Sequence, residues 1–164
     1  MSSKPVVLES TVRMGDFQVL VNAQGPSFYA DEPADLGGKA TGPTPYDLLS
    51  AALGACTAMT IRLYARKKRI ELQRVQVAVQ HDRSESGSES FKRTIHLDGP
   101  LTPEQTDALI AVADRCPISR TLCKGSAITS ELSAEPIAVE PSRTCDREHA
   151  PAVEAACEEF DRTG

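Results

Sequence analysis

The sequence predicts a chain of mixed helices and antiparallel strands, organised around one buried helix. Residues 41–68 are apolar over most of their length, residues 72–82 and 91–97 alternate apolar with polar side chains, and residues 5–30 hold three short β-branched runs separated by turns. A period of two is typical of strands, and a long run that is apolar on nearly all sides is typical of a buried helix. The 164 residues suffice for one core and are too few for two ordinary domains.

The central helix is predicted to begin at the Gly-Pro-Thr-Pro motif of residues 42–45. Proline fits the first helical turn, and Thr44 is a suitable N-cap. Asp47 and Arg62 are the only charges between Pro45 and Ala65, so we expect burial on nearly all sides. The run is short and alanine-rich for a membrane span, and the basic residues 66–69 close the helix where cations complement its dipole.

The flanking elements follow from local patterns. An antiparallel meander is expected over residues 5–30, followed by a closely packed loop at the paired glycines 37 and 38. A serine-rich hairpin loop, 83–90, joins the two alternating strands. Thr102 is predicted as the N-cap of a further helix that ends near Cys116, where Pro117 disfavours helical geometry. A short helical turn over residues 118–122 and a last strand over residues 127–132 complete the prediction.

The composition changes after residue 132. Residues 133–164 are acidic and contain prolines, which predicts a C-terminal tail following a domain of residues 1–132. Residues 151–160 can form one short helix with an apolar side. Cys145 and Cys157 lie in this tail, and we expect both to be exposed thiols without a catalytic role.

Charge and cysteine content exclude several classes of function. A formal charge of −5 argues against nucleic-acid binding, and the absence of an apolar leader after Met1 predicts a cytoplasmic location with no membrane association. Five cysteines, an odd number, do not suggest a disulfide framework. The three scattered histidines and the cysteine spacings match no zinc site, so neither a metal nor another cofactor is expected.

Two cysteines have unusual settings. Cys56 lies among small residues in the central helix, and Cys116 precedes a proline at a helix break. Either could simply be a small core residue. However, the sequence holds no nucleophile elbow, phosphate loop or dinucleotide fingerprint, so thiol chemistry is the only catalytic candidate. A thiolate near a cation or helix dipole attacks a peroxide and becomes a sulfenic acid, which a second cysteine converts to a disulfide.

Three segments resemble the OsmC/Ohr family of osmotically inducible and organic hydroperoxide resistance proteins: residues 30–38, 42–65 and 113–122. The resemblance implies an α+β fold in which two chains intertwine and antiparallel sheets wrap around the central helices of a homodimer. It also implies a peroxidase in which Cys56 is the peroxidatic and Cys116 the resolving cysteine. Organic hydroperoxides would be the substrates, and a dithiol such as a lipoylated protein would be the reductant.

The chain departs from the family pattern around the helix start. Peroxidases of the family commonly carry glutamate directly after the helix-start proline, where this chain has Tyr46 followed by Asp47. The family arginine comes from the N-terminal hairpin, where Arg13 is the only arginine, and Arg120 is another cation to consider. The predicted catalytic set is therefore Cys56, Cys116, Arg13 and Asp47. As alternatives, Arg13 is a solvated hairpin residue and Asp47 only complements the helix dipole.

The altered helix start leaves a second function open. The chain would then be a non-enzymatic dimer that binds a small hydrophobic molecule in an apolar cleft near Cys56, or that senses redox state.

Overall fold

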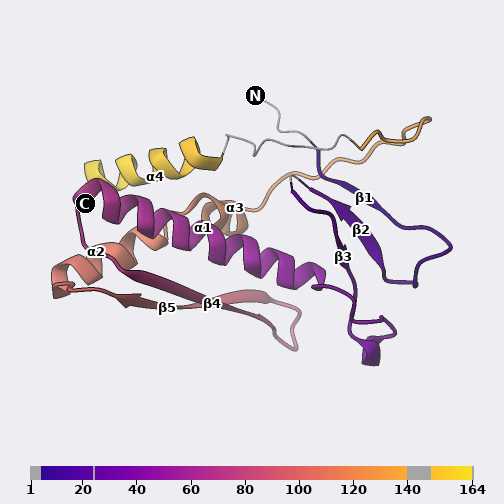
Figure 1. Ribbon diagram of the computed structural model, residues 1–164, viewed down its shortest axis with the longest axis horizontal. Helices are drawn as coiled ribbons and strands as arrows, with labels where there is room; N and C mark the ends of the chain where they lie inside the picture. The colour runs from indigo at the N-terminus through magenta and orange to yellow at the C-terminus, as the bar shows by residue number, and fades with distance from the viewer. Residues whose placement is uncertain (1–4, 24, 140–148, 164) are drawn as a thin grey trace. The chain divides into compact units, whose positions relative to one another are not determined.

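A computed structural model describes residues 5–23, 25–139 and 149–163 (Figure 1). The chain forms two units, which are described separately. The first comprises residues 1–48 and 128–148, and the second comprises residues 49–127 and 149–164. The central helix α1, Pro45–Lys68, begins in the first unit and continues through the second.

The first unit contains the predicted meander. Strands β1 (Val7–Glu9), β2 (Val19–Asn22) and β3 (Phe28–Ala30) form an antiparallel sheet in the order β1-β2-β3. A short 3-10 helix, η1, Ala34–Leu36, ends in the glycine pair. A Cβ on Gly38 would lie 1.9 Å from the Glu32 carbonyl oxygen, which explains why this loop requires a glycine.

The strand predicted over residues 127–132 is wrong. This segment has no regular secondary structure, and Ile128 is 90% and Leu132 100% exposed. A segment forms a strand only where a neighbouring edge accepts its backbone hydrogen bonds, and no described strand pairs with this segment.

In the second unit, strands β4 (Arg74–Arg83) and β5 (Glu89–Asp98) form an antiparallel hairpin that confirms the predicted pair. The register places Val77 opposite Ile95 and Val79 opposite Arg93. These residues belong to the half-buried face of the hairpin, so Arg93 occupies a position that the alternation reserves for apolar side chains.

Three further helices complete the second unit: α2 (Pro103–Ala113), α3 (Pro117–Lys124) and α4 (His149–Thr163). Thr102 caps α2 in a capping box with Gln105, as the sequence predicted for the cap. Figure 1 shows α1 between the β4–β5 hairpin and α4. The main core consists of buried side chains from α1, α2 and α4: Ile61, Tyr64, Ala65, Leu109, Val112, Ala113 and Cys157.

A single chain buries only one face of α1, which corrects the expectation of burial on nearly all sides. The buried residues recur every three or four positions: Leu53, Cys56, Thr57, Thr60, Ile61, Tyr64 and Ala65. On the opposite face, Leu49 is 42% and Met59 55% exposed. By length and composition α1 could also cross a membrane, but core helices of soluble proteins pass the same test.

The C-terminal helix α4 packs into the core, and this corrects the expectation for Cys157. Its side chain is fully buried, whereas an exposed thiol was expected. Val153, Ala156 and Cys157 share the apolar side of α4, and burying that side on α1 and α2 outweighs the polar composition of the preceding segment. Cys145 lies outside the described residues.

Candidate active site

The structure brings Cys56 and Cys116 together. Both thiols are reduced and buried, and with Leu53 they form a separate apolar cluster. Partly buried side chains from the hairpin and from α3 surround it: Val79, Phe91, Ile118 and Leu122. The Cys56 and Cys116 side chains hydrogen-bond to each other. The two cysteines that the sequence selected therefore form one dithiol site.

The pair lies at the N-terminus of α3. Pro117 holds Cys116 outside helical geometry, with φ −59° and ψ 140°, which confirms the predicted helix break, and Cys116 is the N-cap residue of α3. The backbone N–H of Ser119 donates to Cys116 Sγ at 3.3 Å, and that of Ile118 donates to Cys56 Sγ at 3.5 Å. Both sulfurs thus face the positive end of the helix dipole, which favours a thiolate.

Arg93 provides a cation on the other side of Cys116. Its side chain is only 15% exposed and forms an ion pair with Asp114. Its Nη1 donates to Thr57 Oγ1 at 3.1 Å and to the Ala113 carbonyl oxygen at 2.9 Å. Thr57 Oγ1 in turn lies 3.7 Å from Cys116 Sγ, so the guanidinium reaches the sulfur through one hydroxyl.

These contacts separate the acidities of the two thiols. The hydrogen bond from Cys56 lowers the pKa of Cys116 to about 6 against the opposing effect of burial, and Ser119, Thr57 and Arg93 act in the same direction. Conversely, the hydrogen bond to Cys116 and burial raise the pKa of Cys56. These contacts therefore favour ionisation of Cys116 over ionisation of Cys56.

The other two predicted residues belong to the first unit. Arg13 is exposed in the segment between β1 and β2, where its backbone N–H contacts Thr11 Oγ1 at 3.4 Å. The Asp47 carboxylate accepts the Thr44 N–H at 3.0 Å and the Thr44 hydroxyl at 2.8 Å, while Thr44 Oγ1 accepts the Asp47 N–H. These bonds lower the pKa of Asp47. The observed role of Asp47 is therefore to start α1, and Thr44 is the predicted cap.

Two residues of the site were not predicted from the sequence: Arg93 and Thr57. Arg93 falls in the apolar phase of its strand, and a charged residue at such a position is a signal that sequence reasoning could use. Thr57 carries no comparable signal, since it is one small residue among many. Arg120, the alternative cation, instead pairs with Glu159 on α4 at 2.6 Å.

A cavity of about 330 Å³ adjoins the cysteine cluster. Leu53, Phe91 and Leu122 give it apolar walls, and Arg93 and Ser119 give it polar ones. Three of its lining residues, Leu53, Phe91 and Leu122, also contact the cysteine cluster, so a small apolar molecule in this cavity would lie beside the dithiol.

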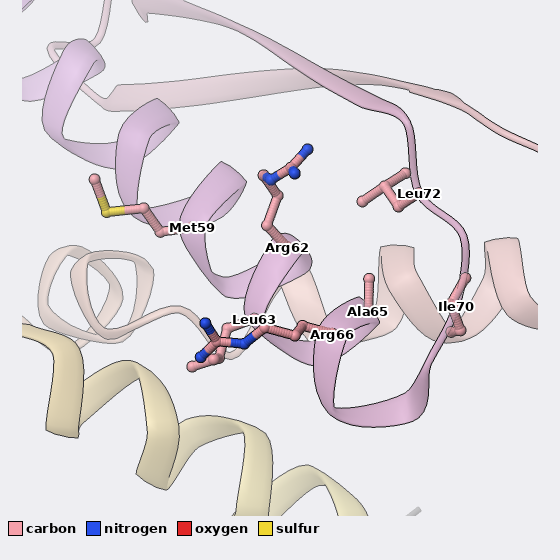
Figure 2. Close-up of a pocket in the computed structure, with 7 residues that line it drawn as sticks. All are labelled: Met59, Arg62, Leu63, Ala65, Arg66, Ile70 and Leu72. Atoms are coloured by element: carbon pink, nitrogen blue, oxygen red, sulfur yellow. The ribbon is translucent and has the colours of Figure 1, made fainter.

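A second cavity, of about 490 Å³, lies at the C-terminal half of α1 (Figure 2). Figure 2 shows Met59, Arg62 and Arg66 on α1, with Ile70 and Leu72 on the segment that follows it. Neither cysteine of the pair lines this cavity. Among the described residues, no group of three or more His, Cys, Asp or Glu side chains could hold a metal ion.

The family assignment comes from a sequence comparison. The profile of the OsmC-like protein family matches residues 37–131, which is more than half of the chain and includes both cysteines of the pair. The chain belongs to the OsmC-like protein family. A search of curated proteins found no significant match to this OsmC-like chain.

Solved structures of OsmC and organic hydroperoxide resistance proteins share the fold of this OsmC-like chain. An OsmC-like protein from Mycoplasma pneumoniae is 21% identical, with a TM-score of 0.61 over 75% of this chain and 89% of that one. An organic hydroperoxide resistance protein OsmC from Legionella pneumophila is 23% identical, with a TM-score of 0.54 over 74% of this chain and 91% of that one. An organic hydroperoxide resistance protein from Elizabethkingia anophelis is also 23% identical, with a TM-score of 0.54 over 73% of this chain and 89% of that one. These similarities establish the α+β fold expected from the sequence.

Proposed function

We propose that this protein is a thiol-dependent peroxidase that reduces organic hydroperoxides through Cys56 and Cys116. The observation that carries the proposal is the contact between two buried thiols, from different elements, at the N-terminus of α3. Oxidation of one thiol beside another leads to a disulfide, and this protects the first sulfur from further oxidation. Structural neighbours that are named organic hydroperoxide resistance proteins support the same function.

The reaction needs two electrons from the pair. The Cys56 sulfur attacks the outer peroxide oxygen, the O–O bond breaks, and the alcohol leaves, so that Cys56 becomes a sulfenic acid. Cys116 then attacks the Cys56 sulfur and displaces water to give the disulfide. An external dithiol restores both thiols by exchange and is itself oxidised. A lipoylated protein in the cytoplasm would supply such a dithiol.

The surroundings of the pair favour an organic peroxide. Leu53, Phe91 and Leu122 line the adjoining cavity, so its walls would contact the hydrocarbon part of a substrate rather than water. Hydrogen peroxide has no apolar part and would gain nothing from these walls. We therefore expect a higher kcat/KM for cumene hydroperoxide than for hydrogen peroxide.

A homodimer is part of the proposal. The exposed face of α1 presents Leu49, Ala52, Ala55 and Met59 at helical spacing, and a second copy would cover this stripe. In such a dimer Arg13 or Asp47 can be supplied to the dithiol, which keeps both residues as catalytic candidates. Analytical ultracentrifugation of the full chain should give twice the monomer mass, and Met59→Glu should shift it toward monomer.

The activity test uses the purified full chain with cumene or tert-butyl hydroperoxide and a dithiol. Wild type should consume peroxide over many turnovers, and Cys56→Ser should not. Cys123→Ser is the matched control, because Cys123 is an exposed thiol that does not belong to the cysteine cluster. A Cys56→Ser variant as active as the parent would show that this assignment is wrong.

The second candidate function is non-enzymatic binding of a small hydrophobic molecule. The cavity in Figure 2 favours it, because its apolar walls carry two arginines that form no ion pair with any described residue. That chemistry suits an apolar ligand with an acidic group. Native mass spectrometry of the purified protein tests this function: a bound amphiphile, together with no peroxide turnover under any dithiol, would favour it over the peroxidase.

A further inference from the structure

The C-terminal helix α4 contacts the segment that carries Cys116. We propose that Glu159 and Phe160 of α4 are positioning residues that keep residues 115–120, the Cys116 segment, where Cys116 reaches Cys56, and that they thereby speed formation of the disulfide. The inference rests on the proposed peroxidase chemistry and concerns its second step, the reaction of the sulfenic acid with the second thiol. The family profile matches residues 37–131, and α4 lies outside that match.

The Cys116 segment depends on other elements for its position. It leads from the end of α2 into α3, which has only eight residues and buries none of them fully. A helix of this length is not stable by itself in water, so tertiary contacts must hold it. On one side, Ile118 and Leu122 pack against the cysteine cluster. Arg93 holds the chain at Asp114, one residue before the segment begins.

Helix α4 contacts both ends of the same segment. The Glu159 carboxylate accepts a hydrogen bond from Arg120 Nη1 at 2.6 Å. The Arg115 guanidinium lies over the Phe160 ring, 5.1 Å from its centroid. The same ring packs edge-on against Tyr64 of α1, with centroids 5.4 Å apart and an interplanar angle of 83°. Two successive residues of α4 therefore tie the segment to α1, the helix that carries the other cysteine of the pair.

A disulfide tolerates little displacement of this segment. The two sulfurs must approach to about 2 Å and their Cβ atoms to about 3.8 Å. Any excursion of the segment away from α1 lowers the effective concentration of one sulfur at the other, and a small misplacement of reacting atoms has a large effect on rate. By contacting both ends of the segment, α4 limits these excursions.

The step that α4 assists competes with a second oxidation. In the assisted step the Cys116 sulfur bonds to the sulfur of the Cys56 sulfenic acid, the S–O bond breaks, and hydroxide leaves as water with the proton of the Cys116 thiol. In the competing step a second hydroperoxide transfers one oxygen to the sulfenic acid and leaves as its alcohol, so that Cys56 becomes a sulfinic acid. The ratio of disulfide to sulfinic acid therefore reports how well the Cys116 segment is placed.

The first experiment measures this ratio at Cys56 by peptide mass spectrometry of the full chain after a pulse of excess cumene hydroperoxide. Phe160→Leu keeps an apolar side chain without the ring and should lower the ratio by about threefold, whereas Phe160→Tyr keeps the ring and should match wild type. Cys157→Ala is the control, because it weakens α4 at a buried site in the main core and should leave the ratio unchanged. A wild-type ratio in Phe160→Leu, or an equal loss in Cys157→Ala, would overturn the role of Phe160.

The second experiment exchanges the charges of the ion pair between α3 and α4. The fraction of Cys56–Cys116 disulfide is measured at equilibrium in buffers of reduced and oxidised glutathione. Arg120→Glu and Glu159→Arg each place like charges together and should lower the equilibrium constant for the disulfide by about threefold, and the double variant should restore it. Lys68→Glu is the matched control, because it reverses an ion pair of α4 with α1 and should have no such effect. A double variant no better than the single ones, or an equal loss in Lys68→Glu, would overturn the role of Glu159.

The glutathione experiment uses no peroxide, so it separates the two proposals. If the charge exchange restores the disulfide but the wild type consumes no cumene hydroperoxide, the role of α4 holds and the proposed peroxidase fails. If the wild type turns over peroxide but neither the Phe160 variants nor the charge reversals change disulfide formation, the peroxidase holds and the role of α4 is wrong.

Discussion

Cys116 and Cys157 are both fully buried, and both contact α1, yet their surroundings differ in kind. Cys116 is the N-cap of α3 and meets a backbone N–H, a hydroxyl and a second thiol. Cys157 lies within α4 among apolar side chains, and its thiol donates a hydrogen bond to the Thr60 carbonyl oxygen, 3.9 Å away, which cannot donate one to a thiolate. Burial therefore does not decide what a thiol can do; the donors that face the sulfur decide it.

The acidities of the two thiols express this difference. Burial raises the pKa of Cys157, and the nearby carboxylates of α4 oppose ionisation as well. At Cys116 the same effect of burial is outweighed by four donors or charges, and the pKa falls to about 6. A desolvated thiol surrounded by donors is reactive, whereas a desolvated thiol surrounded by hydrocarbon is inert.

The largest expected effect is on reactivity. After mild treatment with cumene hydroperoxide, mass spectrometry of peptides should find a Cys56–Cys116 disulfide and an unmodified Cys157, because only the first pair combines a thiolate with a second thiol in contact. Peroxide-dependent modification of Cys157 at a comparable rate would remove the distinction between the two buried sites.

The second effect is on stability as a function of pH. The folded pKa of Cys116, about 6, lies below its unfolded value of about 8.5, so between these pH values the unfolded chain binds more protons. The free energy of unfolding should therefore rise with pH across this window, by on the order of 3 kcal/mol, and this contribution is lost as pH falls through 6. The raised pKa of Cys56 acts in the opposite sense above about pH 8.5, where stability should fall again.

Urea unfolding at several pH values measures this dependence, with Cys116→Ser as the reference that cancels other titrating groups. The difference between wild type and the variant should increase from about pH 6 to about pH 8.5. A flat difference would mean that Cys116 titrates alike in the folded and unfolded chain.

The sequence predicted the elements that depend on local chemistry. Thr44 and Thr102 cap helices, Pro117 places Cys116 at a helix break, and the period of two defines the β4–β5 hairpin. Local chemistry failed where a distant partner decides the outcome. Residues 127–132 were expected to form a strand, but no described strand pairs with them, so this segment stays without regular structure.

The site was predicted only in part, because some of its contacts join residues that are distant in the sequence. Cys56 and Cys116 stand out locally, through small neighbours and a proline, and the structure confirms that they meet. Arg93 reaches Thr57 across 36 positions of sequence, and only the register of the hairpin on α1 sets that contact. For Cys157 the prediction of a helix over residues 151–160 with an apolar side is confirmed, and the exposure expected for its thiol is wrong because the docking of that side on α1 and α2 has no local signal.

A smaller effect is expected from the inert thiol. Cys157→Ala should lower the free energy of unfolding by about 1 kcal/mol, the typical cost of removing one buried group of this size, and leave peroxide turnover unchanged. The matched control is Cys123→Ala, because Cys123 is exposed on α3 and its removal leaves no cavity. Urea unfolding and the peroxidase assay measure both properties. A large loss of turnover in Cys157→Ala at full folding would assign Cys157 a chemical role and end the contrast with Cys116.

The smallest effect concerns the ion pairs that join α4 to the end of α1. Lys68 Nζ lies 2.9 Å from the Asp161 carboxylate, and Lys67 Nζ lies 3.5 Å from that of Glu158, with side chains that remain substantially exposed. Exposed pairs contribute little, since water and salt screen them. Lys68→Met should therefore lower the free energy of unfolding by about 0.5 kcal/mol or less, and high salt should erase this difference from wild type. The same result is expected for Lys67→Met. A loss several times larger would mean that these ion pairs, rather than the apolar side of α4 alone, keep α4 and its Cys157 packed on the core.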